Sequence, residues 1–77
     1  MGSQEHLTTL WVNGEPRPYT PQTVAELLET LGLDPQRPGI AVAVNDAIVP
    51  RDMWAASTLC PGDRVEIVRA VAGGSRP

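Results

Sequence analysis

The stretch TVAELLETLG, residues 23–32, decides the fold because it contains every signal of a short amphipathic helix. Thr23 and Glu26 have the spacing of a capping box, in which each side chain bonds the other residue's backbone N–H. Apolar side chains recur at spacings of three and four residues and predict one buried stripe, formed by Val24, Leu27, Leu28 and Leu31. Gly32 stands where a left-handed C-terminal cap is expected, and Pro35 prevents the helix from continuing. The helix must therefore pack this stripe against another element.

Two strands joined by a tight turn are predicted before the helix. Residues 7–12 alternate, with Leu10 and Val12 on one face and Trp11 on the other. Asn13 and Gly14 tolerate the positive φ angles of a two-residue hairpin turn. A short second strand is expected over residues 17–19, at an edge of the sheet because prolines stand in and beside it.

Three further strands are predicted after the helix. Residues 40–44, IAVAV, place Ile40, Val42 and Val44 on one face and the small Ala41 and Ala43 on the other. A turn at residues 45–46 leads into a short strand over residues 47–49, and RDMWAAS then predicts a helical turn with Trp54 as a lid over the core. The last strand begins at Arg64, with its Val65 and Ile67 facing inward.

The order of these elements predicts an α+β domain with a mixed sheet of four to five strands. A helix that links a hairpin to a further strand is expected to cover one face of that sheet, which leaves the other face open. We expect residues 1–6 to be a disordered lead, with residues 1–3 compatible with a cloning remnant. Residues 7–71 are expected to form the domain, and residues 72–77 a flexible tail that contains Gly73 and Gly74.

The composition excludes several classes of protein. The chain has 77 residues and a formal net charge of −3, with nine acidic residues against six basic ones, so a nucleic-acid-binding surface is not expected. No apolar run is long enough for a membrane span, and no signal peptide is recognised. The lone Cys60 rules out an internal disulfide and is consistent with a cytoplasmic location. No metal site and no nucleophile–base pair is visible, so we expect a protein that is not an enzyme.

Four segments resemble one known family, in the same order along the chain: WVNGEPR, TVAELLETLGL, IAVAVNDAIVPRDMW and PGDRVEIVRAVAGG. They are similar to the ThiS family, the sulfur carriers of thiamine thiazole synthesis, from about Leu10 to Gly74. The resemblance implies the β-grasp, ubiquitin-like fold that this family shares with the small subunit of molybdopterin synthase. That fold agrees with the predicted order of elements.

The resemblance also implies a site and a set of partners. In ThiS-like proteins the carboxylate of the last glycine, here Gly74, is adenylated by a ThiF-like adenylyltransferase that uses ATP. Sulfur from a donor such as a cysteine desulfurase then forms a thiocarboxylate, and a ThiG-like thiazole synthase accepts it. The chain itself would bind no cofactor. Ala72 and Gly73 would thread the partner's channel, for which glycine is suited because it has no Cβ.

The sequence departs from the family after Gly74, where Ser75-Arg76-Pro77 follows. In an intact chain the Gly74 carbonyl is an amide, which cannot be adenylated. Three explanations are open: a processing protease removes the tripeptide, the tripeptide comes from an expression vector, or the protein has lost the chemistry. Removal by a protease is the hypothesis that we favour, because the rest of the tail is intact.

Partner contacts and the final sulfur acceptor remain open at this level. Trp11 on the open face is an equal candidate for a partner anchor and for an ordinary surface aromatic residue. Arg69 could pair with acidic residues of an activating enzyme, although a solvated strand charge is the more common outcome. Alternative functions are sulfur delivery to molybdopterin, cysteine or natural-product pathways, ubiquitin-like protein modification, and a non-catalytic interaction module.

Overall fold

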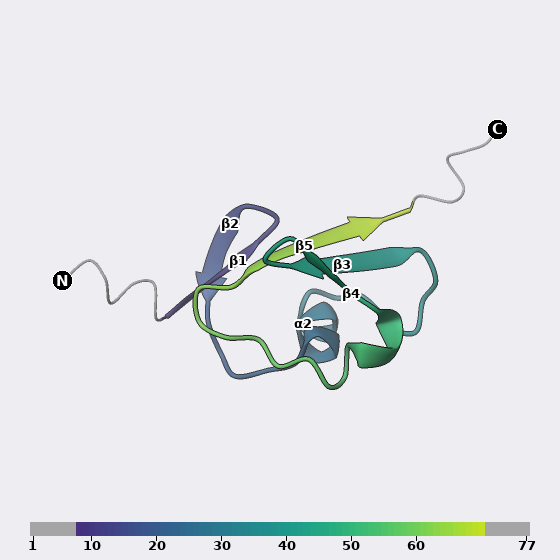
Figure 1. Ribbon diagram of the computed structural model, residues 1–77, viewed down its shortest axis with the longest axis horizontal. Coiled ribbons are helices and arrows are strands. Elements are labelled where there is room, and N and C mark those ends of the chain that lie inside the picture. The colour runs from purple at the N-terminus through teal and green to yellow at the C-terminus, as the bar shows by residue number, and fades with distance from the viewer. Residues whose placement is uncertain (1–7, 71–77) are drawn as a thin grey trace.

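The computed structural model describes residues 8–70 and contains one mixed five-stranded sheet with one α-helix on one face (Figure 1). The strands are β1 (Thr9–Val12), β2 (Glu15–Pro18), β3 (Ile40–Val44), β4 (Ala47–Val49) and β5 (Arg64–Arg69). Their order across the sheet is β2-β1-β5-β3-β4. The pair of β1 and β5 is parallel, and the other three neighbouring pairs are antiparallel. The order of elements along the chain is the predicted one.

The helix α2 (Val24–Thr30) confirms the capping box. The Thr23 hydroxyl oxygen accepts from the Glu26 N–H at 3.2 Å, and the Glu26 carboxylate accepts from the Thr23 N–H at 2.9 Å. The next two N–H groups, of Val24 and Ala25, donate to carbonyls of the segment that follows β4. All the N–H groups at this helix end are therefore satisfied, two of them by a segment about thirty residues later in the chain.

The C-terminal end of α2 is the predicted left-handed cap. Gly32 has a φ of +82°, its N–H donates to the Glu29 carbonyl, and the Leu33 N–H donates to the Leu28 carbonyl at 2.8 Å. These two bonds form a Schellman motif, which ends the helix while satisfying its last carbonyls.

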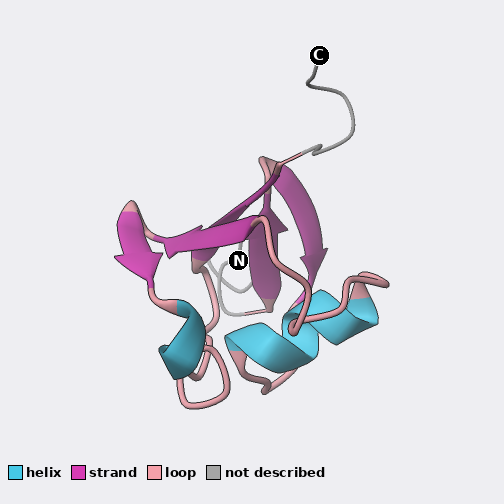
Figure 2. Ribbon diagram, turned by 90° about the vertical axis from the view of Figure 1, so that its right-hand side faces the viewer, coloured by secondary structure: helices cyan, strands magenta, loops and turns pink. Residues whose placement is uncertain are grey.

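The core lies between α2 and the sheet. Its buried side chains come from the helix, from strands β1, β3 and β5, and from the segment after β4: Leu10, Val12, Val24, Leu27, Leu28, Val42, Trp54, Leu59 and Val65. Figure 2 shows α2 and the short 3₁₀ helix η1 (Arg51–Met53) on the same side of the sheet. The predicted inward faces of β1, β3 and β5 and the lid role of Trp54 are confirmed; the Trp54 indole N–H donates to the Val49 carbonyl at 2.9 Å.

The predicted bounds of the hairpin were wrong. The first strand begins at Thr9, with Thr8 in a turn and Leu7 outside the described residues, and the second strand runs over Glu15–Pro18 instead of residues 17–19. The two-residue turn explains the second shift, because it places Glu15 directly opposite Val12. The prolines of β2 face the non-hydrogen-bonded positions of β1, so their missing N–H groups would point to the outer edge. The edge position itself is confirmed.

Candidate functional site

The predicted site follows β5, the central strand of the sheet. Ala72, Gly73 and Gly74 lie outside the described residues, as do the predicted lead at residues 1–6 and the tripeptide after Gly74. The structure describes the root from which this tail starts. β5 ends at Arg69, and the Ala70 N–H donates to the Gly39 carbonyl at 2.7 Å.

The loop before β3 holds this root. Gly39 has a φ of +86°, a conformation that side chains with a Cβ rarely adopt. The guanidinium of Arg51 donates to the carbonyls of Pro35 and Arg37 in the same loop. It also stacks on the Trp54 ring, with its Cζ atom 4.6 Å from the ring centroid. The loop that bonds the last described residue of the chain is therefore tied to the core.

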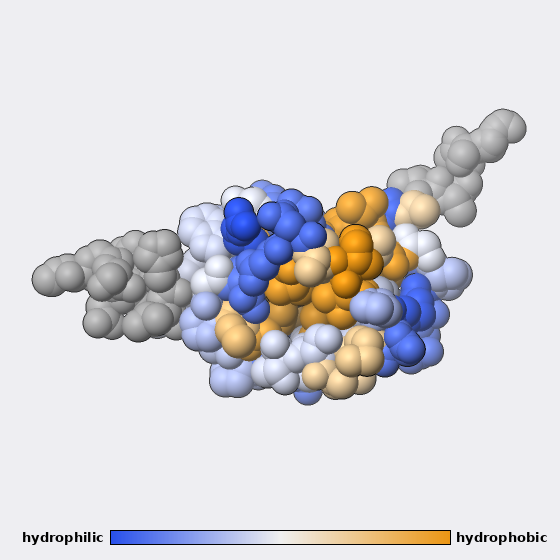
Figure 3. All heavy atoms as spheres, viewed as in Figure 1, coloured by the Kyte–Doolittle hydropathy of each residue, from blue (hydrophilic) through white to orange (hydrophobic). Residues whose placement is uncertain are grey.

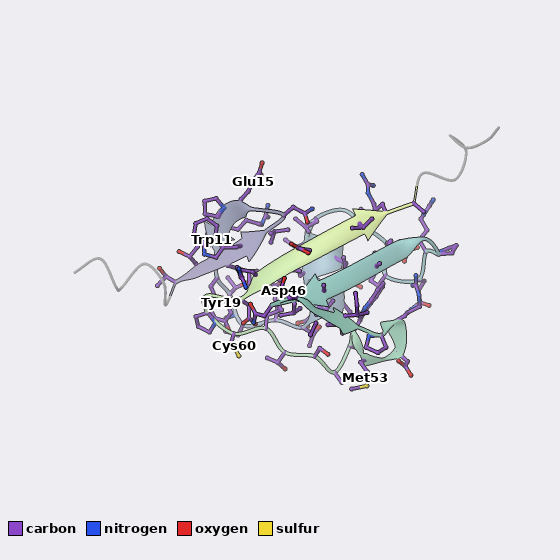
Figure 4. All side chains as sticks on the ribbon, turned by 45° about the horizontal axis from the view of Figure 1, so that its top comes forward. Trp11, Glu15, Tyr19, Asp46, Met53 and Cys60 are labelled. Atoms are coloured by element: carbon purple, nitrogen blue, oxygen red, sulfur yellow. The ribbon has the colours of Figure 1, made fainter. Side chains whose placement is uncertain are left out.

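The two predicted partner contacts lie far apart. Trp11 pairs with Arg64 at the start of β5, whereas Arg69 is the last residue of that strand. Five residues of strand separate these ends by about 17 Å. Side chains alternate between the two faces along a strand, so Trp11 lies on the open face and Arg69 lies on the opposite face, which α2 covers at other positions. Trp11 is half-buried beside β2 (Figure 4), and Arg69 is exposed. The structure does not bring these two side chains into one site.

An apolar patch on the open face of the sheet lies closer to the tail than Trp11 does. We define the apolar patch as Ala41, Ala43, Ile48 and Val68, which are cross-strand neighbours on β3, β4 and β5. Ile48 is 72% exposed and Val68 is 64% exposed, so large apolar side chains face solvent here. Figure 3 shows hydrophobic residues gathered over β3, β4 and β5, in contrast to the hydrophilic residues over β2.

The two alanines of the apolar patch were predicted to share one face of the sheet, whereas its two large side chains were not predicted to be exposed there. The signal that could have found Val68 was the alternation of β5, which directs Val65 inward and residue 68 outward. Ile48 is harder to recognise because its strand has only three residues.

Polar chemistry is sparse in the described part of the chain. The ion pair found there joins Arg64 to Asp46 at 3.5 Å, with both side chains largely exposed. Within residues 8–70, no group of three His, Cys, Asp or Glu side chains could hold a metal ion. Over the same range, no helix is both long and apolar enough to cross a bilayer. The features that a partner could recognise are thus the apolar patch and the root of the tail.

Comparison with solved structures defines the class of protein. The crystal structure of the thiamine biosynthesis protein ThiS from Geobacter metallireducens superposes with a TM-score of 0.71 and 32% sequence identity, over 86% of this chain and 99% of that one. The mixed sheet with one helix is therefore the β-grasp fold of small sulfur carriers.

Sequence comparison then shows the family. A model of the ThiS family matches residues 10–74, and the chain belongs to that family. The sulfur carrier protein ThiS of Escherichia coli is 45% identical over 53 residues, which are 69% of this chain and 77% of that protein. The sulfur carrier protein ThiS of Thermus thermophilus is 37% identical over 84% of this chain and 98% of that protein. The chain is thus a ThiS sulfur carrier of thiamine biosynthesis and not an enzyme.

A further relative joins this kind of domain to another protein. The thiazole synthase of Paramagnetospirillum magneticum is 40% identical to 86% of this chain, and the matched part is 20% of that protein. In that relative, a ThiS-like segment and a thiazole synthase are associated in one polypeptide.

Proposed function

We propose that this chain carries sulfur as a thiocarboxylate on Gly74 and delivers it to thiazole formation. The observation that carries the proposal is the extent of the family match, which ends at Gly74 and includes the glycine pair. The residues after it, Ser75-Arg76-Pro77, lie outside the match. Cleavage between Gly74 and Ser75 would turn the Gly74 amide into the carboxylate that the chemistry needs.

The reaction sequence requires no acid, base or metal from the carrier. An adenylyltransferase would join the Gly74 carboxylate to the AMP part of ATP and release pyrophosphate. The terminal sulfur of a persulfide, carried by a donor such as a cysteine desulfurase, would then displace AMP and form an acyl disulfide. A thiol reductant would cleave its sulfur–sulfur bond, which leaves the thiocarboxylate on Gly74 and oxidises the thiol to a disulfide. The thiocarboxylate sulfur is a better nucleophile than the carboxylate oxygen. Activation in one partner can therefore be separated from delivery in another.

The dimensions of the chain are compatible with this division of labour. Four residues connect Ala70 to Gly74, and a chain of that length can span at most about 14 Å. The reacting carboxylate could thus lie well inside a partner while the sheet stays at the partner's surface. Residues without large side chains suit such a passage, and the segment before the reacting carboxylate is Ala72-Gly73.

We propose that the apolar patch contacts the adenylyltransferase. It contains two of the large apolar side chains that are exposed in the described part of the chain, and one of them, Val68, lies on the strand that leads into the tail. Small alanines between Ile48 and Val68 allow close approach of a partner surface. Apolar side chains that are exposed in a free monomer and buried in a complex are a usual source of binding energy.

The thiazole synthase is proposed as the sulfur acceptor because a relative combines both proteins in one chain. Delivery to another pathway, or attachment to lysines of other proteins, would use the same thiocarboxylate. These alternatives differ from the proposal only in the molecule that accepts the sulfur. The experiment must therefore include the proposed acceptor, a thiazole synthase.

The test compares three forms of the chain: the full sequence, a form that ends at Gly74, and a form that ends at Gly73. Each is incubated with a ThiF-like adenylyltransferase, ATP, a cysteine desulfurase with cysteine, and dithiothreitol as the reductant, and then analysed by intact mass. We expect one oxygen to be replaced by sulfur in the Gly74-terminated form alone. Adding a thiazole synthase with its substrates should then return that form to a carboxylate with formation of thiazole. A Gly74-terminated form that never gains sulfur would contradict the proposal.

A further inference from the structure

Two asparagines bond the backbone near the two ends of β5. Asn13 and Asn45 both have a φ of +51° and both stand in two-residue turns between strands. The Asn13 carboxamide oxygen accepts from the Ile67 N–H at 2.8 Å, and its nitrogen donates to the Ile67 carbonyl at 3.3 Å. The Asn45 oxygen accepts from the Arg64 N–H at 2.9 Å. The two residues therefore have the same conformation and similar chemistry, one near the tail and one at the opposite end of the strand.

Asn13 continues the sheet where β1 stops. The parallel ladder between β1 and β5 ends at Val12 and Val65, after which the Asn13 N–H donates to the Val65 carbonyl at 2.8 Å. The main chain then turns away at Gly14. A carboxamide offers one acceptor and one donor group like those of a peptide unit. The Asn13 side chain thus satisfies Ile67 in the way that a further residue of a neighbouring strand would.

The bonds between Asn13 and Ile67 lie on the edge of β5 that faces β1, at the end of its hydrogen bonding towards the tail. On the other edge, β3 pairs with β5 as far as Ile40 and Arg69, and Gly39 bonds Ala70. Alternation along the strand directs the N–H and C=O of Arg69 to the same side as those of Ile67. Within residues 8–70, no strand lies beside Arg69 on that side. Among the residues that the structure describes, Asn13 is thus the last to hold this edge of β5 towards the tail.

We propose that Asn13 is a positioning residue for the chemistry at Gly74, an inference that rests on the proposed function. By bonding both polar groups of Ile67, it keeps the last residues of β5 in strand geometry and fixes the direction in which the chain leaves the sheet. A partner then meets a tail whose root is already ordered. Ordering that root during binding would otherwise lower the affinity for the activating enzyme.

The test uses the form that ends at Gly74, with Asn13→Gly and Asn45→Gly as matched variants. Glycine tolerates the positive φ and removes the whole side chain with its carboxamide, so neither variant introduces backbone strain. For Asn13→Gly we expect the KM for the carrier in adenylyltransferase turnover to rise about fivefold. A change of this size corresponds to part of the conformational entropy that is lost when one backbone residue is ordered. The kcat should stay within about twofold, because the enzyme itself orders the tail once it is bound. Asn45→Gly should leave both parameters within about twofold.

Two further measurements separate positioning from a general loss of stability. Amide hydrogen exchange should accelerate at Ile67 in Asn13→Gly and at Arg64 in Asn45→Gly, which shows that each variant removes its own bond. Asn13→Asp keeps the acceptor for the Ile67 N–H and loses the donor, so its KM should lie between those of the wild type and Asn13→Gly.

The outcomes distinguish this inference from the proposed function. If the wild-type form gains sulfur and the KM is unchanged in Asn13→Gly, the positioning role is overturned and the carrier function stands. Equal increases of KM in Asn13→Gly and Asn45→Gly would also overturn it, because they would indicate a structural role shared by both turns. A wild-type form that gains no sulfur would contradict both proposals.

Discussion

The two faces of the sheet differ in what their apolar residues do. On the face under α2, Leu10, Val42 and Val65 are almost completely buried. On the open face, Ile48 and Val68 are largely exposed, although they belong to the same strands or to adjacent ones. Adjacent residues of β5 thus serve the core and the surface in turn. The comparison indicates that stability comes from one face and that the other is available for recognition.

The largest effect expected from this difference is on stability. Leu28→Ala, in the centre of the helix stripe, removes a completely buried side chain and should lower the free energy of unfolding by about 2–5 kcal/mol. The matched change on the open face, Val68→Ala, should cost no more than about 0.5 kcal/mol. Urea denaturation followed by circular dichroism measures both. Similar losses in the two variants would contradict the division between the faces.

The next effect concerns binding. Val68→Asp places a charge in the apolar patch and should weaken the complex with a ThiF-like adenylyltransferase about tenfold, with the fold retained. Met53→Asp is the control, because Met53 is also an exposed apolar residue (48%) but lies on η1, outside the apolar patch. Calorimetric titration of each variant gives the Kd. If Met53→Asp weakened binding as much as Val68→Asp, the open face would not be the contact surface.

A smaller effect is expected at the start of α2. Thr23→Ala removes the hydroxyl that caps the Glu26 N–H and should lower the free energy of unfolding by about 1 kcal/mol. Thr30→Ala makes the same change at the other end of the helix, where the hydroxyl only donates back to the Glu26 carbonyl, and should be close to neutral. Thermal unfolding of both variants measures the difference. An equal shift in both would show that the capping box adds no stability.

The elements governed by local sequence were predictable. The helix, its two caps and the strands β3 and β4 follow from periodicity and from residues that favour turns, and all of these agree with the structure. The bounds of β2 were not predictable in this way, because they depend on the pairing that the turn sets, with Glu15 opposite Val12. Leu59 was missed as a core residue, since its place beside α2 is fixed by contacts distant in sequence, such as its N–H bond to the Gln22 carbonyl.

The candidate site also combines a feature that the sequence could predict with contacts that it could not. Gly74 was predicted as the reacting residue by resemblance to a family, and this role stays a prediction; the family match extends to Gly74. The bonds from Asn13 to Ile67 join residues 54 positions apart, so no local pattern could have indicated them. Asn13 was interpreted only as a turn residue, which is correct for its backbone but not sufficient for its side chain.

The central claim is that Gly74 becomes the sulfur-bearing end of this carrier. The most direct measurement is the intact mass of the protein isolated from its source organism without a tag. We predict a chain that ends at Gly74, with part of the population carrying sulfur in place of one carboxylate oxygen. A chain that always retains Ser75-Arg76-Pro77 and never carries the additional sulfur would contradict the account.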